Sequence, residues 1–195
     1  MATKKPIPIY QLKIALLDIK PTIFRILQIK GNASLGKLHH YIQGVMGWQD
    51  YHLHKFIVNG QSYLSSEQMY EDIEDDPDTH DEKTYRLNKL EQGNKFIYVY
   101  DFGDCWEHEI TVEKIFSPED GVYYPVCTYG ERACPPEDCG GSIGYEDLLE
   151  VLNDPTHEEY EHYSEWAGDF DPKRFNLDEV NDRLSRIKSN LREPK

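Results

Sequence analysis

The chain has 195 residues, of which 38% are hydrophobic and 12% aromatic, and its formal net charge is −15 at pH 7. This composition is too apolar for a chain that is disordered as a whole, and the length favours one domain, residues 1–195, with a sizeable core. No apolar run approaches the roughly 20 residues of a membrane span, and residues 1–10 do not have the pattern of a signal peptide. We therefore expect a cytoplasmic protein without membrane association, whose four cysteines are thiols or ligands rather than disulfides.

The charge is unevenly distributed along the chain. Residues 1–40 contain seven Lys or Arg residues and one acid, whereas residues 133–172 contain twelve acids and no Lys or Arg. An acidic surface repels nucleic acid and attracts basic proteins. The sequence therefore suggests a basic protein partner, and it allows direct nucleic-acid binding only through the basic N-terminal segment; a purely solvated acidic surface is the simpler alternative.

The N-terminal third predicts a hairpin followed by a helix. Apolar residues alternate with polar ones over 10–16, and 23–29 forms a second β-rich run, so the two predict antiparallel strands. Ser34 is the predicted N-cap of a helix that ends at Gly47-Trp48. The predicted hairpin carries the basic residues Lys13, Lys20, Arg25 and Lys30.

A second hairpin and an acidic segment follow. Residues 52–58 and 61–64 predict strands joined by Asn59-Gly60, a strong two-residue turn signal. Residues 67–82 hold nine acids and no Lys or Arg. We therefore expect an exposed, mobile excursion over about residues 65–83.

The rest of the chain predicts a later hairpin and then helices. Strands are expected at 96–101 and 105–116, joined by Phe102-Gly103-Asp104 with Gly103 free to take a positive φ. The sequence CPPEDCGGSIG is typical of a loop followed by a helix start. Three helices are expected: the first at 145–153, the second from a capping box formed by Thr156 and Glu159 to about residue 166, and the third at 177–191. The predicted fold is α+β: a mostly antiparallel sheet, beginning strand-strand-helix-strand-strand, with helices packed on it and a helical part at about 145–192.

The stretch YDFGDCWEHEI, residues 100–110, concentrates reactive side chains. Along a strand, Trp106 and His108 share one apolar face. His108 is then either a half-buried histidine hydrogen-bonded to Asp101 or Asp104, or a general base oriented by one of these carboxylates. Asp101, Asp104 and His108 are the catalytic candidates.

A divalent metal is the cofactor that the sequence allows. His52 and His54 fall on one face of a predicted strand, about 7 Å apart, which suits two ligands of one ion, although packing beside Phe56 and Val58 on that face is the simpler interpretation. The cysteines show no CxxC pair, so a zinc ribbon is not indicated. The metal candidates are His52, His54, His108, Cys127 and Cys134.

Several long motifs together resemble the plasmid pRiA4b ORF-3-like family. They are PTIFRILQIKGNASLGKLHHYIQGVMGW with HLHKF, then YVYDFGDCWEHEI, then YPVCTYGERACPPEDCGGSIGYEDLLEVL, and the resemblance spans residues 10–184. It implies a single α+β domain and an association with plasmids and other mobile elements. It also marks a polar signature set that we expect to converge on one cleft: Arg25, His39, His52, Asp101, Asp104, His108, Glu137 and Asp138.

Three functions follow as expectations. The first is a non-catalytic binding or interaction module that uses an acidic surface or a polar cleft formed by Arg25, His39, His52, Trp106, Glu137 and Asp138. The second is a metal-dependent, hydrolase-like enzyme with His, Asp and Cys ligands. The third is DNA binding through the basic N-terminal hairpin.

Overall fold

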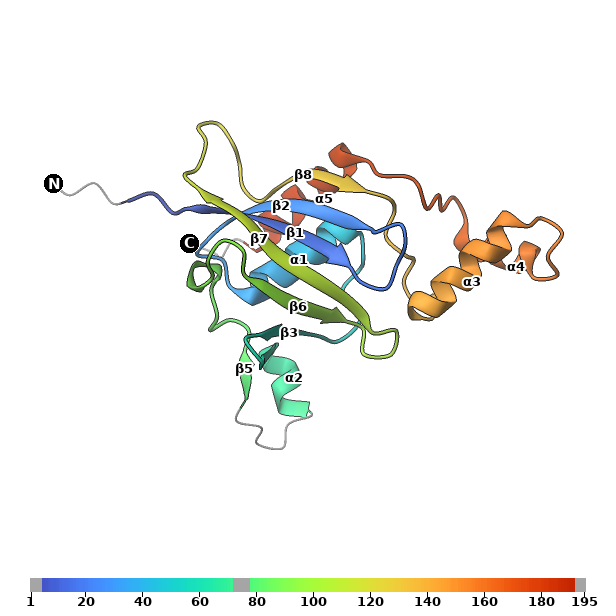
Figure 1. Cartoon of the computed structure of the whole chain (residues 1–195), viewed down its shortest axis with the longest axis horizontal. Helices are drawn as coiled ribbons and strands as arrows, with labels where there is room; N and C mark the ends of the chain where they lie inside the picture. Colours follow the sequence, from blue (N-terminus) through green and yellow to red (C-terminus); the bar gives the residue numbers. More distant parts are fainter. Residues whose placement is uncertain (1–4, 72–77, 192–195) are drawn as a thin grey trace.

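In the computed structural model, which describes residues 5–71 and 78–191, the chain adopts an α+β fold with one mostly antiparallel sheet (Figure 1). Within these residues the sheet has eight strands in the order β5-β4-β3-β6-β7-β1-β2-β8. The strands are β1 (Ile9–Leu16), β2 (Phe24–Lys30), β3 (His54–Val58), β4 (Gln61–Leu64), β5 (Thr79–Asp81), β6 (Lys95–Tyr100), β7 (Trp106–Phe116) and β8 (Val126–Glu131). The helices are α1 (Leu35–Met46), α2 (Ser66–Glu71), α3 (Gly141–Asn153), α4 (Tyr160–Ala167) and α5 (Leu177–Asn190).

The long strand β7 joins the two halves of the sheet. It pairs with β6 on one side and with β1 on the other, both antiparallel, and the β4–β5 pair is parallel. Trp106, His108, Ile110 and Val112 are buried, whereas the residues between them are partly exposed. The alternation that predicted one apolar face of this strand is therefore confirmed, and the buried face lies under α1 and α5 (Figure 1).

Helix α1 begins and ends where the sequence predicts. The Ser34 side chain accepts a hydrogen bond from the Lys37 amide, and Gly47 takes the left-handed conformation with φ 98°. Its apolar residues pack on the sheet, and its Gly44 lies against Ile187 of α5. α1 and α5 thus form the layer that covers one face of the sheet (Figure 1).

Two turns show where local rules succeed and fail. Asn59 and Gly60 have φ values of 53° and 81°, as the predicted two-residue hairpin requires. In the β6–β7 loop the positive φ values belong instead to Asp101 (58°) and Cys105 (56°). The expectation for Gly103 was wrong because the Asp101 side chain accepts the Gly103 amide hydrogen bond, which stabilises the left-handed aspartate.

The acidic segment is more ordered than expected where it is described. It contains helix α2 and strand β5. The Ser66 hydroxyl, near the start of the segment, donates a hydrogen bond to the Asp81 carboxylate, near its end. Glu82 is buried. The interpretation of the whole of 65–83 as a mobile excursion is therefore wrong for these parts, because pairing with the sheet edge and a buried hydrogen bond between His54 and Glu82 order them. Residues 72–77 lie outside the described residues.

The C-terminal part differs from the prediction in three places. Strand β8, which pairs with β2, was missed, and α3 starts at Gly141 rather than at residue 145. The predicted Thr156 capping box is wrong, because the Thr156 hydroxyl donates to Asp154 and α4 begins only at Tyr160.

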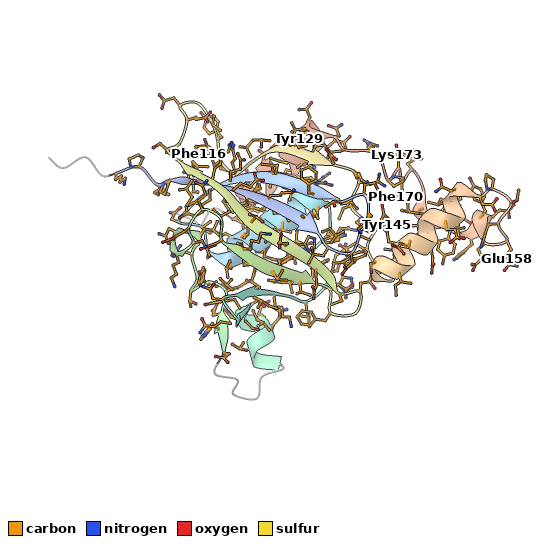
Figure 2. All side chains as sticks on the ribbon, in the orientation of Figure 1. Phe116, Tyr129, Tyr145, Glu158, Phe170 and Lys173 are labelled. Carbon is orange, nitrogen blue, oxygen red and sulfur yellow. The ribbon has the colours of Figure 1, made fainter. Side chains whose placement is uncertain are left out.

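An arm made of α3 and α4 projects from one end of the sheet layer (Figure 1). Tyr145, at the base of α3, is buried and packs edge-to-face against Phe170, with 6.3 Å between ring centroids (Figure 2). This contact attaches the arm to the core. Among the residues that the structure describes, none of the helices combines the length and apolar character that crossing a bilayer demands.

Candidate functional site

A polar cleft of about 460 Å³ opens between α1, the segment before β3 and the start of the acidic segment. Histidines and carboxylates dominate its walls: His39, His40, Asp50, His52, His54 and Glu82. Two clusters of these side chains can be distinguished. We call them the inner cluster, around His39 and His54, and the outer cluster, around His52.

Two stacked imidazoles form the centre of the inner cluster. The rings of His39 from α1 and His54 from β3 are parallel within 3°, with 3.4 Å between their centroids. His39 Nδ1 lies 2.8 Å from the Tyr98 hydroxyl, and His39 Nε2 lies 2.7 Å from Asp50 Oδ1. Gln43 donates to the Tyr98 hydroxyl at 3.0 Å.

This chain of hydrogen bonds fixes the tautomer of His39. Because the Gln43 amide donates to Tyr98, the Tyr98 hydroxyl is free to donate to Nδ1 of His39, whose Nε2–H then donates to Asp50. Burial lowers the pKa of His39 to about 4. Burial alone would raise the pKa of Asp50, but hydrogen bonds from His39 and His40 outweigh it and hold that pKa below its usual range. His39 is therefore neutral and Asp50 is charged at neutral pH.

The partner of His54 comes from the acidic segment. His54 Nε2 lies 2.8 Å from Glu82 Oε2, and both side chains are buried. Gly36 of α1 leaves the room for this carboxylate, since a Cβ there would lie 2.7 Å from Glu82 Oε1. Each stacked imidazole thus has its own carboxylate, which satisfies the buried polar atoms.

The outer cluster brings together three distant segments of the chain. His52 Nε2 lies 3.0 Å from Asp138 Oδ1, 3.7 Å from Asp101 Oδ2 and 3.8 Å from Glu137 Oε2. This nitrogen is shielded from solvent, yet it has no hydrogen-bond partner of good geometry among the described residues. It faces carboxylates without being satisfied by them.

Backbone geometry positions the two aspartates. Asp101 follows β6 with φ 58°, and Asp138 precedes α3 with φ 57°. The left-handed conformation is one that aspartate tolerates better than larger residues, and with it each carboxylate lies within 3.7 Å of His52 Nε2. The side chain of Asp101 is 11% exposed, whereas that of Asp138 is 68% exposed. The cluster therefore has a buried floor and an open mouth.

Glu137 is held by hydrogen bonds from the other wall. Its Oε1 accepts from the Gln49 amide at 2.7 Å and from the Tyr100 hydroxyl at 3.2 Å. The Tyr51 amide in turn donates to the Tyr100 hydroxyl. Burial, followed by the charge of Glu137, raises the pKa of Tyr100, so this hydroxyl remains a hydrogen-bond donor. Glu137 is thus fixed as an acceptor at the edge of the cluster.

The outer cluster has the composition of a cation site. Donor atoms of His52, Asp101 and Asp138 all lie within 4.8 Å of one another, and so do those of His39, Asp50 and His54 in the inner cluster. In the inner cluster His39 is already paired with Asp50 and His54 with Glu82, whereas the outer histidine nitrogen is unsatisfied. One imidazole with two or three carboxylates suits a divalent transition metal such as Zn²⁺, Mn²⁺ or Fe²⁺.

Other predicted residues serve the fold. Asp104 accepts a hydrogen bond from the Gly140 amide at 3.1 Å. Trp106 is buried beside Trp48, and His108 is fully buried with its Nδ1 3.1 Å from the Trp106 carbonyl. The structure therefore places two of the catalytic candidates, Asp104 and His108, outside both clusters, since alternation in β7 turns His108 into the core.

Arg25 and the cysteines also lie elsewhere. Arg25 is buried and donates to the carbonyls of Val45, Phe24, Glu131 and Arg132. Cys127 is buried on β8, and burial raises the pKa of the Cys134 thiol, so both remain protonated thiols. Neither cysteine belongs to a cluster of metal-ligating geometry within the described residues.

The expected convergence of the polar signature set is therefore partial. His52, Asp101, Glu137 and Asp138 converge, and His39 lies in the adjoining cluster. The interpretation of His52 and His54 as ligands of one ion is wrong, because β3 starts at His54 and the two rings enter different clusters. Sequence reasoning missed Asp50 and Glu82, which no local motif marks as functional.

The fold and cleft define an α+β protein with a histidine- and carboxylate-lined polar cleft beside its sheet. Residues 8–179 match the sequence profile of the family described as plasmid pRiA4b ORF-3-like protein. The chain belongs to this family.

Two relatives support the assignment. The chain is 32% identical over 177 residues to the "Uncharacterized protein y4hQ" of Sinorhizobium fredii (strain NBRC 101917 / NGR234). This match covers 89% of this chain and 89% of the relative. The crystal structure titled "Protein of Unknown Function MM3350 from Methanosarcina mazei Go1" is similar with a TM-score of 0.81 and 38% sequence identity, covering 90% of this chain and 99% of that one. The fold is therefore shared with the solved Methanosarcina mazei structure.

Proposed function

We propose that the protein is a binding module that holds a divalent transition metal through His52, Asp101 and Asp138, in the outer cluster at the edge of the polar cleft. The observation that carries the proposal is the His52 Nε2 atom, shielded from solvent and unpaired while it faces three carboxylates within 3.8 Å. A cation between these groups would remove both the unsatisfied nitrogen and the repulsion among the carboxylates. Glu137, held by Gln49 and Tyr100, would orient the outer side of the site.

Metal content and affinity test the proposal. Protein purified without chelators should contain near-stoichiometric metal, and the chelated protein should bind added Zn²⁺ or Mn²⁺ in a calorimetric titration. Asp101→Asn should weaken that binding at least about tenfold, because it removes a charged ligand while its Oδ1 can still accept the Gly103 amide.

A matched control is available in the same chain. Asp18 is exposed and has φ 58°, so Asp18→Asn makes the same chemical change at the same backbone conformation, outside the cluster. The control should bind metal as the unaltered chain does. The proposal is wrong if Asp18→Asn and Asp101→Asn bind metal with equal affinity. It is also wrong if neither the unaltered protein nor the variants bind metal.

Metal-dependent hydrolysis is the second candidate function. The exposed Asp138 leaves the mouth of the outer cluster open, and a cation with three protein ligands keeps positions for water. The metal-loaded protein would then hydrolyse a simple ester such as p-nitrophenyl phosphate, and Asp138→Asn would abolish the activity. Metal binding without turnover of such esters would favour the binding role.

Besides the metal site, the binding module has a second surface, on the arm formed by α3 and α4 and the residues that flank α4. Glu158, Glu161, Glu165 and Asp169 are exposed there, together with Trp166, which is 46% exposed. Acids around an exposed aromatic side chain suit a basic protein partner. An Arg-rich peptide should be bound by the protein and released by salt.

A further inference from the structure

A second cavity, of about 390 Å³, lies at the opposite end of α1 from the Gly47 cap. Its walls come from the end of β2, the start of α1, the loop before β8 and the last turn of α5. It shares no lining residue with the polar cleft. We call it the basic pocket, after its four cationic residues Lys30, Lys37, Arg86 and Lys188.

The charge of the basic pocket opposes that of the protein. No aspartate or glutamate lines it among the described residues, although the chain as a whole carries −15. Lys30, Lys37 and Lys188 come from β2, α1 and α5 and Arg86 from the segment after β5, so folding rather than sequence proximity gathers them. Such a local concentration of positive charge attracts anions to the pocket.

The cations surround an apolar floor. Arg86 is exposed, and its Nη1 donates to the Asn32 carbonyl at 2.7 Å, which fixes the guanidinium at the rim. Tyr41 and Tyr124 are nearly buried and form walls of the cavity with Ile29. The first turn of α1 contains no acid, so its positive end adds to the field of the lysines.

We propose that the basic pocket binds a small phosphate-bearing molecule with an apolar ring, of the size of a nucleoside monophosphate. Its volume falls in the range of roughly 300–1,000 Å³ that small-molecule sites occupy. Arg86 and the lysines would bind the phosphate through charge-assisted hydrogen bonds. The tyrosine and isoleucine walls would contact the ring.

Calorimetric titration of the full chain with AMP, adenosine and inorganic phosphate tests the proposal. AMP should bind most tightly, phosphate more weakly and adenosine not detectably, and AMP affinity should fall as salt rises. The double variant Lys37→Gln/Arg86→Gln should weaken AMP binding about tenfold or more, since two charge-assisted contacts are lost. The proposal is overturned if AMP does not bind, or if adenosine binds as well as AMP.

Two controls separate pocket, fold and metal. Lys20→Gln/Lys173→Gln makes the same charge change at exposed positions outside the pocket and should leave AMP binding unchanged. Lys30→Gln at the rim should weaken AMP binding even if the double variant unfolds. The unaltered protein titrated in EDTA and the Asp101→Asn variant should both bind AMP with the same affinity as the untreated protein. If AMP binding is lost in both, the phosphate binds at the proposed metal site in the outer cluster, and the proposal is overturned.

Discussion

His108 illustrates at the scale of one residue how the fold decides what a side chain does. A histidine between two glutamates in the sequence looks reactive, but the alternation of β7 places it in the core. It lies edge-on to Trp48, with 5.3 Å between ring centroids, and 5.4 Å from the Tyr98 ring. Burial lowers its pKa to about 4. His108 is therefore a neutral core residue at physiological pH.

This pKa predicts how stability depends on pH. A histidine in the unfolded chain has a pKa of about 6.5, so between about pH 6.5 and 4 the unfolded state binds a proton that the folded state does not. The free energy of unfolding should therefore fall as the pH is lowered through this window, by up to ~3 kcal/mol for His108. Urea unfolding at a series of pH values should show a smaller fall in His108→Gln than in the unaltered chain. Equal slopes would contradict the assignment.

Arg25 is a second residue whose role is structural. Its guanidinium donates to carbonyls of β2, the end of α1 and the end of β8, and it stacks 4.7 Å from the centre of the Phe175 ring. Arg25→Lys should lower the free energy of unfolding by about 2–4 kcal/mol, because an ammonium cannot reproduce the planar set of donors. Metal binding should not change. Arg174→Lys, at an exposed ion pair, should have little effect on stability and serves as the control.

At the scale of elements, the contact between α1 and α5 depends on a missing side chain. A Cβ at Gly44 would lie 2.6 Å from Ile187 Cδ1, which is closer than atoms can approach. Gly44→Ala should therefore lower stability by up to about 1 kcal/mol, although alanine is the better helix former, because the end of the Ile187 side chain would have to move aside.

A double-mutant cycle isolates this contact. Ile187→Val removes only Cδ1, so Gly44→Ala should be neutral or stabilising in the Ile187→Val background. Chemical denaturation of the four proteins gives the coupling energy. If Gly44→Ala costs the same in both backgrounds, the close approach of the helices is not what limits residue 44.

Elements with strong local signals could be predicted from the sequence. The caps of α1 at Ser34 and Gly47 and the Asn59-Gly60 turn depend on neighbouring residues alone, so sequence indicates them. Strands β5 and β8 are short or weakly patterned and are stabilised by pairing with distant strands. Their existence depends on contacts that periodicity does not contain.

The site was predictable only as a set of residue types. The family resemblance marked His52, Asp101, Glu137 and Asp138, but their convergence depends on two left-handed aspartates and on the register of β3 with β6. Two further residues complete the inner cluster. Asp50 comes from a segment that looks like a surface turn, and Glu82 comes from the acidic segment. Sequence spacing could not show that the acidic segment returns to bury one carboxylate beside His54.

At the scale of the whole molecule, the fold disperses the basic residues of the N-terminal hairpin. Arg25 is opposite Ile14 and lies on the helix-covered face, whereas Lys13 points to the other face, where its Nζ lies 4.8 Å from the centre of the Phe24 ring. Lys30 belongs to the basic pocket. The hairpin therefore presents no continuous basic stripe.

From this dispersal and the net charge of −15 we expect no binding of duplex DNA. An electrophoretic mobility shift assay at low salt, where phosphate contacts are strongest, should show no retardation. A retarded band whose intensity falls steeply with added salt would contradict this expectation and restore the hairpin as a nucleic-acid surface.

The pairing of β1 with β7 also has a consequence during synthesis. Ile9 of β1 is paired with Phe116 of β7, so the centre of the sheet joins residues that are more than a hundred positions apart in the sequence. At about 5–20 residues per second, the ribosome needs at least ~4 s to deliver the partner strand after the first hairpin emerges. Throughout that interval the edge of β1 has no β7 to pair with. We therefore expect the sheet to be completed only after the middle of the chain has left the ribosome, so that the first hairpin stays open to wrong strand pairing until then.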